Sequence, residues 1–224
     1  MRVLVVAPHP DDDLIGCGGS IAKHLKREAE VSVVYVTYGD AENLNHSKEE
    51  FTDLRRRETL KATEAIGLNP EKLVFLGETV WGINQDRARR SLLHIVREWK
   101  PDVCYIPHAN DAHVDHRIVH HIAEDAINMA SSPWFKEYGT QEDSWSVSTV
   151  LCYEVWTPLV EISYTEDITE FIDEKLDALL KHESQIAERR YDEAVRGLNR
   201  YRGAMTGSGT YCEVFQVIKM TKAF

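Results

Sequence analysis

The sequence predicts an α/β fold: a single Rossmann-like domain of three layers, built on a mostly parallel sheet. Short runs dominated by apolar residues alternate along the chain with longer segments of helical periodicity. Unbroken apolar runs are typical of parallel strands, which are buried on both faces. The order strand, helix, strand favours parallel βαβ units. No repeat or linker interrupts the pattern, so residues 1–224 are expected to form one domain.

The predicted elements follow from these runs and from signals at helix ends. The expected strands are 3–7, 31–37, 72–77, 102–107, 149–156 and 212–220. The expected helices are 20–29, 47–67, 88–100, 115–130, 166–183 and 185–202. Ser47 and Glu50 form a capping-box pattern, and Gly67 is a typical residue after a helix end. We interpret the glycines of GCGG (16–19) as a tight turn before the first helix, because their spacing fits no phosphate-binding loop.

Composition and charge narrow the classes of partner. The net charge of −11 argues against nucleic acid or an anionic membrane, because both select basic surfaces. No apolar stretch reaches the roughly 18 residues of a membrane span, and the N-terminal run is too short for a signal peptide. The four cysteines form no C-x-x-C pair, so reduced thiols and a cytoplasmic location are expected. The remaining partner is a small molecule, and the sequence leaves a homo-oligomer open.

Two polar segments follow two of the predicted strands. HPDDD (9–13) comes after the first strand, and PHANDAHVDH (107–116) overlaps the end of the fourth. Ligands bind outside the carboxyl ends of parallel strands, so we expect the two segments to meet at one edge of the sheet. The three adjacent aspartates of the first segment repel one another, and a divalent cation would relieve that repulsion.

Histidine nitrogen and aspartate oxygen are the ligand types of a catalytic zinc, which takes three protein ligands. His9 and Asp12 are three residues apart, and His116 could complete the set. Asp11 could instead accept the proton of the attacking water. Fe²⁺ suits these ligands as well as Zn²⁺. Taken singly, each aspartate could cap the next helix and each histidine could lie at a helix end; the two motifs together favour the metal site.

These motifs resemble those of the PIG-L/LmbE-like de-N-acetylases, zinc enzymes that remove acetyl groups from conjugates containing N-acetylglucosamine. The family has AHPDDE after its first strand and HPDH or a variant later, where this chain has PHPDDD (8–13) and HVDH (113–116). The similarity continues through RRETLKATEAIG, KPDVCYIPHANDAHVDH, KLDALLKHESQ and YCEVF (56–67, 100–116, 175–185 and 211–215). It therefore covers nearly the whole chain.

The resemblance implies a role for each motif residue. The implied zinc ligands are His9, Asp12 and His116. Asp11 is implied to be the general base, and His113 the acid or electrostatic partner of the oxyanion and the leaving amine. Asp115 is implied to be the carboxylate that orients His113. The implied reaction is hydrolysis of the acetamide of an amino sugar conjugate.

Other positions carry two interpretations. Arg55 lies where the family often has a pocket arginine, but it could also form an ion pair with Glu58 on one helix face. Asp13 replaces the usual Glu and is expected either to brace the loop or to contact the substrate. Val114 replaces a common Pro, so that turn is expected to be less rigid. The loops expected to wall the substrate pocket are 39–47, 78–86 and 131–148.

Two other functions remain open from the residues alone. One is a non-catalytic nucleotide- or sugar-binding module, which explains the fold and the glycines but not the second motif. The other is a metal-dependent phosphoesterase, whose sites usually hold two metals about 3.5–4 Å apart. The ligands counted in this sequence are sufficient for one metal.

Overall fold

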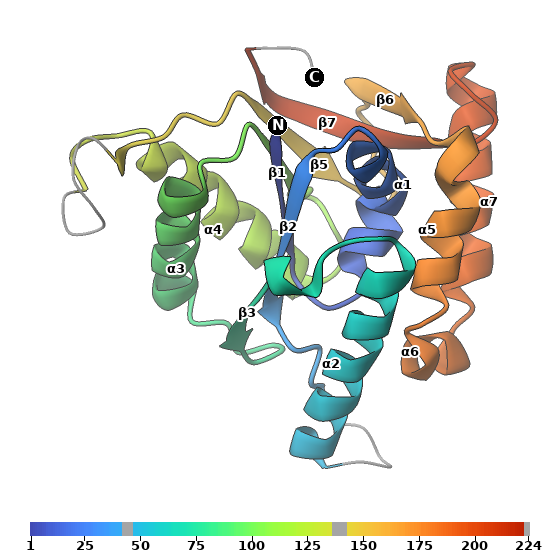
Figure 1. Ribbon diagram of the computed structural model, residues 1–224, viewed down its shortest axis with the longest axis horizontal. Helices are drawn as coiled ribbons and strands as arrows, with labels where there is room; N and C mark the ends of the chain where they lie inside the picture. Colours follow the sequence, from blue (N-terminus) through green and yellow to red (C-terminus); the bar gives the residue numbers. More distant parts are fainter. Residues whose placement is uncertain (42–46, 136–142, 222–224) are drawn as a thin grey trace.

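The computed structural model describes residues 1–41, 47–135 and 143–221, and its strands lie in one sheet (Figure 1). The strands are β1 (Arg2–Ala7), β2 (Glu30–Thr37), β3 (Leu73–Glu78), β4 (Val103–Pro107), β5 (Thr149–Tyr153), β6 (Tyr164–Asp167) and β7 (Cys212–Met220). Their spatial order is β3-β2-β1-β4-β5-β7-β6. The pairs from β3 to β5 are parallel, and β7 is antiparallel to both of its neighbours. The predicted α/β fold with a mostly parallel sheet is confirmed.

Helices cover both faces of this sheet (Figure 1). They are α1 (Asp12–Lys26), α2 (Lys48–Ala65), α3 (Gln85–Trp99), α4 (Val114–Ala130), α5 (Ile172–Leu179), α6 (Glu183–Glu188) and α7 (Tyr191–Thr206). Alternate residues of β1 face opposite layers: Val3 and Val5 join the core under α1 and α5, while Leu4 and Val6 join the core under α3 and α4. The central strand is therefore apolar throughout because both of its faces are covered.

The strand order places a topological switch point between β1 and β4. These two strands pair in parallel, Val3 with Val103 and Val5 with Tyr105, and the chain leaves them toward opposite halves of the sheet. Crevices at such switch points, outside the carboxyl ends of the strands, are where open α/β sheets bind ligands. The two polar segments follow these two strands, so the fold brings them together as predicted.

The C-terminal third differs from the sequence prediction. The segment Tyr164–Asp167 was expected to lie outside a strand or at a helix start, but it forms the edge strand β6 on β7. Helix α5 consequently begins at Ile172, after a short 3₁₀ turn, and not at residue 166. A four-residue edge strand with two acidic side chains has no apolar pattern by which it could be recognised. Strand β5 also ends at Tyr153, three residues earlier than expected.

Helix α1 begins eight residues earlier than expected, so the predicted glycine turn is wrong. The glycines lie inside the helix, which bends at Cys17 (φ −143°). A Cβ added at Gly16 would lie 2.2 Å from the Tyr153 ring, and one at Gly19 would lie 2.7 Å from Ile168. The glycines therefore allow the predicted close approach between helix and sheet, while the turn itself is made by Asp11.

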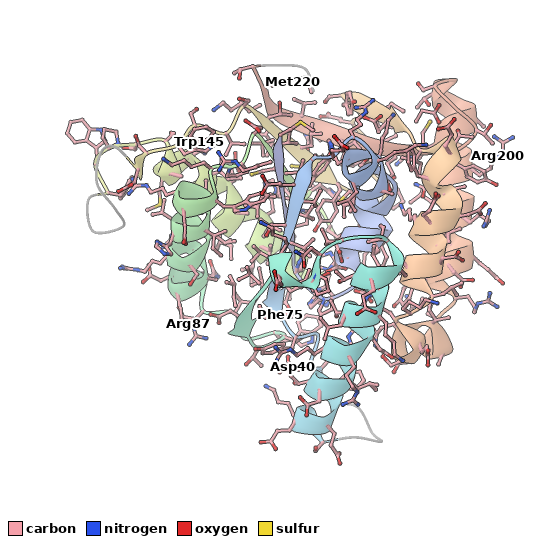
Figure 2. The ribbon with its side chains drawn as sticks, in the orientation of Figure 1. Asp40, Phe75, Arg87, Trp145, Arg200 and Met220 are labelled. Atoms are coloured by element: carbon pink, nitrogen blue, oxygen red, sulfur yellow. The ribbon has the colours of Figure 1, made fainter. Side chains whose placement is uncertain are left out.

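The described parts of the predicted pocket loop 131–148, residues 131–135 and 143–148, lie at the end of the sheet opposite the polar segments. The Trp145 indole N–H donates to the Pro101 carbonyl (2.6 Å), and the Ser148 N–H donates to Asp102 (3.1 Å), both next to the start of β4. In Figure 2, Trp145 lies in the upper part of the view and Asp40 in the lower part. Because α4 runs back along the sheet, the connection after it must start at the amino edge. Residues 136–142 of this loop, and 42–46 of the loop 39–47, lie outside the described residues.

Within the described part of the chain, no helix combines the length and apolar character needed to cross a membrane.

Candidate active site

The turn between β1 and α1 carries His9, Asp11 and Asp12 in an unusual backbone conformation. Asp11 has a φ of 112°, in a region that non-glycine residues rarely occupy. The buried Arg55 guanidinium donates to the Pro10 carbonyl, and its Nη2 lies 3.3 Å from Asp11 Oδ2. Strain of about 1–3 kcal/mol is typical of such positions at functional sites. The turn separates the Asp11 carboxylate, beside Arg55, from the Asp12 carboxylate, beside His9.

Three side-chain atoms from the two motifs form a small triangle. His9 Nδ1 lies 3.0 Å from Asp12 Oδ2, and His116 Nε2 lies 3.2 Å from the same oxygen. The two nitrogens are 3.3 Å apart. Ligands about 2.0–2.1 Å from a tetrahedral zinc lie about 3.3 Å from one another. The triangle therefore has the size of one face of such a coordination shell, and these residues fit a divalent cation.

The electrostatics of the triangle also favour a cation. Burial opposes charge on Asp12, but His116 and His9 hold the pKa of Asp12 well below its usual range. Burial likewise lowers the pKa of His116, but the Asp12 and Asp111 carboxylates together outweigh this and raise the pKa to about 10. The anionic oxygen thus draws positive charge to this point, where a metal ion would compete with protons.

Each of the two histidines has its own carboxylate. Asp115 Oδ2 lies 3.1 Å from His9 Nε2 and also accepts the Trp81 backbone N–H (3.1 Å). Asp111 Oδ1 lies 3.2 Å from His116 Nδ1. Carboxylates on the far ring nitrogen orient metal-binding histidines and leave the other nitrogen as a ligand. The structure therefore corrects the predicted role of the Asp115 carboxylate, which contacts His9, whereas Asp115 reaches the His113 ring through its backbone N–H.

His113 is placed to donate a hydrogen bond into the site. Its Nδ1 accepts the Asp115 backbone N–H (3.2 Å). Burial, with His9 and His116 nearby, lowers the pKa of His113 to about 4. The ring is therefore neutral at pH 7 and carries its proton on Nε2. Although one ligand atom each of His9, His113 and His116 lies within 4.8 Å of the others, a protonated Nε2 is a donor and not a metal ligand.

Asp11 stays outside the triangle and keeps a carboxylate of raised basicity. Burial raises its pKa to about 6, although the Arg55 guanidinium acts in the opposite direction. A carboxylate whose pKa lies near neutrality suits a general base. Arg55 itself keeps two buried guanidinium nitrogens, Nε and Nη1, without a hydrogen-bond partner among the described residues.

Arg55 and Asp13 lie on different sides of the turn. Arg55 lines the cavity, and the alternative ion-pair partner Glu58 instead accepts hydrogen bonds from the Ser184 N–H and hydroxyl (both 2.7 Å). Asp13 is buried below the turn, where the Tyr35 hydroxyl donates to its Oδ2 (2.9 Å). Asp13 is thus placed to brace the turn, and it is not among the residues that line the cavity.

A cavity of about 210 Å³ opens in front of the triangle. Its lining consists of His9, Asp11, Asp12, Ile15, Gly39, Ala41, Arg55, Val80, Trp81, His113, Trp156, Gln185 and Tyr191. Trp81 is 67% exposed, has a positive φ of 62°, and lies 4.6 Å from the His113 ring between centroids. Aromatic faces beside polar donors suit a ring that is apolar on its faces and polar at its edge.

The sequence pattern of the PIG-L family, described as GlcNAc-PI de-N-acetylase, matches residues 4–127, more than half of the chain. The chain belongs to this family. The match includes every residue of the triangle and both carboxylates behind it.

Similar proteins extend the comparison to almost the whole chain. The diacetylchitobiose deacetylase of Thermococcus kodakarensis is 27% identical over 92% of this chain and 79% of that protein. The N,N'-diacetylchitobiose deacetylase of Pyrococcus horikoshii, solved with an inhibitor, has a TM-score of 0.84 at 27% identity, covering 97% of this chain and 83% of that one. The 4-carboxy-2-hydroxymuconate hydratase GalB of Pseudomonas putida also reaches 0.84, at 21% identity over 100% and 99% of the chains. That last likeness shows the fold alone.

Several residues of this PIG-L site were missed by the sequence analysis. Asp111 stands within the quoted second motif, but its contact with His116 could not be read from spacing. Trp156 follows β5 and Tyr191 is the first residue of α7, so both lie far from the two motifs in the sequence. The available signal for Trp156 was its position just beyond the carboxyl end of a strand, where α/β sheets place ligand-binding residues.

Proposed function

We propose that this chain is a metal-dependent N-deacetylase that hydrolyses the acetamide of a small N-acetylglucosamine conjugate. One observation carries the proposal: the His9–Asp12–His116 triangle has the size of a metal coordination face, and a further carboxylate, Asp11, stands beside it without joining it. A ligand set together with a separate basic carboxylate is what amide hydrolysis by water requires. The deacetylase relatives supply the substrate class.

A divalent cation held by His9, Asp12 and His116 supplies Lewis acidity toward an amide carbonyl and toward water. Asp11 accepts a proton from the attacking water. The His113 Nε2–H then donates to the oxygen that becomes negative as the carbonyl carbon turns tetrahedral. Breakage of the C–N bond, with a proton delivered to nitrogen, gives acetate and a free 2-amino sugar.

We infer zinc as the resident ion, since two imidazoles and one carboxylate are a zinc ligand set of the catalytic type. Fe²⁺ is the alternative, because imidazole and carboxylate suit it as well. Metal analysis of protein purified without added metal, together with activity after reloading each ion separately, distinguishes the two.

The test of the activity is acetate release from a soluble N-acetylglucosaminide by metal-loaded protein, before and after chelation. We expect acetate and an equal amount of free amine, both abolished by the chelator. His113→Ala should retain its metal and lose mainly kcat, because the hydrogen bond strengthens in the transition state. The matched control is His94→Ala, which changes an exposed histidine of α3 and should leave both metal content and kcat unchanged.

The same assay separates the other functions. A binding module would hold no stoichiometric metal and release no acetate. A phosphoesterase would hydrolyse p-nitrophenyl phosphate faster than the amide. Release of acetate from long chitin chains in preference to a soluble conjugate would contradict the small-substrate part of the proposal, since loops of this size enclose a cavity of only about 210 Å³.

A further inference from the structure

A second cavity, of about 180 Å³, adjoins the first. Its lining consists of Ile15, Val155, Trp156, Arg189, Tyr191, Ala194, Val195 and Leu198. Three of these, Ile15, Trp156 and Tyr191, also line the cavity in front of the metal triangle. The two cavities therefore share a wall, and no residue of the metal triangle lines the second one.

The second cavity is apolar on nearly every side. Four of its residues lie at positions 191, 194, 195 and 198 of α7, the i, i+3, i+4, i+7 spacing of one helix face. In most helices such a face packs against the core. Here Val195 is buried, but Ala194 is exposed and Leu198 half-buried, so part of the apolar face lines open space. Apolar surface left uncovered beside an active-site cavity is characteristic of ligand sites.

Hydrogen bonds connect the shared wall to the loop between β4 and α4, which carries Asp111. Asp111, which contacts His116, accepts the Trp156 backbone N–H (2.9 Å). The Trp156 ring meets the Tyr191 ring edge to face, with centroids 5.7 Å apart. The Arg189 guanidinium lies 5.0 Å from the Trp156 ring, in cation–π range, and its aliphatic stem adds apolar surface at the rim. The aromatic pair is thus held at a defined position relative to the triangle.

We propose that the second cavity binds the aglycone of the substrate and that this aglycone is apolar, an aryl ring or a short alkyl chain. The inference rests on the proposed deacetylase function. With the acetamide on C2 of the sugar directed to the metal triangle, the neighbouring C1 carries the aglycone past Trp156 and Tyr191 into the second cavity.

The lining disfavours a hydroxyl-rich aglycone such as a second sugar or a cyclitol. The polar side-chain groups among its residues are the Arg189 guanidinium, the Tyr191 hydroxyl and the Trp156 indole N–H. Most hydroxyls of a polar aglycone would lose water without gaining a partner, which costs binding energy. An apolar group gains roughly fourfold in affinity for each methylene that it buries.

The test compares kcat/KM for acetate release from methyl and benzyl N-acetylglucosaminides and from N,N'-diacetylchitobiose. We expect kcat/KM for the benzyl glycoside to be at least about tenfold higher than for the methyl glycoside. We expect kcat/KM for the disaccharide to be no higher than for the methyl glycoside. Ala194→Phe should fill the cavity and reduce the benzyl-to-methyl ratio toward one. Ala204→Phe, the same change at an exposed position of the same helix outside both cavities, should keep the parent ratio.

Binding of the deacetylated products distinguishes the two levels of the proposal. Calorimetry with benzyl and methyl 2-amino-2-deoxyglucosides measures the subsite without turnover. If no glycoside releases acetate but the benzyl product binds about tenfold more tightly, and Ala194→Phe removes this preference, the deacetylase function fails and the apolar subsite stands. Equal affinities of the benzyl and methyl products would overturn the subsite whatever the activity, and so would a higher kcat/KM for the disaccharide than for the benzyl glycoside.

Discussion

Helix α1 touches two buried carboxylate clusters that differ in how their polar atoms are satisfied. At its middle, Glu213 is almost fully buried, and both of its oxygens are paired. Oε1 accepts from the Gly19 N–H (2.8 Å) and Lys175 Nζ (2.7 Å), and Oε2 accepts from the N–H (2.8 Å) and hydroxyl (2.6 Å) of Ser20. Glu213 thus caps the part of α1 that restarts after the bend at Cys17.

At the N-terminal end of α1, two imidazole nitrogens and one carboxylate oxygen of the metal triangle converge within 3.3 Å of one another. Buried atoms around them, including Asp115 Oδ1, Asp13 Oδ1 and two nitrogens of Arg55, have no hydrogen-bond partner among the described residues. A buried network in which every atom is paired stabilises a fold, whereas unpaired buried polar atoms mark places where water, an ion or a ligand completes the hydrogen bonding. The comparison indicates which buried charges serve structure and which serve binding.

We expect the largest effect from a substitution in the N-terminal cluster. His116→Ala removes one corner of the triangle, so bound metal and acetate release should fall together to near background. Metal analysis of the purified variant, with acetate release in parallel, measures this. Full metal occupancy in this variant would exclude His116 as a ligand.

A second change separates the base from the ligands. Asp11→Asn should keep near-normal metal content while kcat falls by roughly 10²–10⁴, the span usually lost with a general base. Metal analysis and initial rates on the same sample make the comparison. Loss of metal in this variant would mean that Asp11 is a metal ligand and not the general base.

A change in the central cluster should affect stability. Lys175→Met leaves the Glu213 carboxylate buried without its cation and should lower the free energy of unfolding by about 3–5 kcal/mol, as measured by urea denaturation. The double variant Lys175→Met/Glu213→Gln should recover part of this loss. Lys61→Met, at an exposed lysine, should stay within about 0.5 kcal/mol of the parent. An equally small effect of Lys175→Met would remove the structural role of the pair.

At the C-terminal end of α1, the buried His24 should make the stability of the protein depend on pH. Burial lowers the pKa of His24 to about 4, below its ordinary value of 6.5, and His24 Nε2 contacts the Tyr105 hydroxyl at 2.9 Å. Between pH 6.5 and 4, His24 is therefore protonated in the unfolded chain but neutral in the folded protein. The free energy of unfolding consequently falls as the pH drops through this range, by about 3 kcal/mol for this group. In denaturation curves over this range, His24→Gln should flatten the dependence; an unchanged slope would contradict the assignment.

Local pattern alone determined much of this protein. Apolar runs with no alternation specified buried parallel strands, and the order of strands and helices specified the layers. The sequence also indicated that His9, Asp12 and His116 would meet, because segments following parallel strands emerge at one edge of a sheet. These inferences need only the periodicity of the chain and the general rules of strand connection.

The tertiary structure decided which distant atoms pair. Asp115 lies two residues after His113 in the sequence, yet its carboxylate contacts His9, more than a hundred residues away. The aromatic wall of Trp156 and Tyr191 and the packing of Gly16 of α1 against Tyr153 of β5 likewise depend on how helices dock on the sheet. Spacing along a chain constrains side chains within a turn or two, whereas contacts between elements follow from packing, which no local pattern encodes.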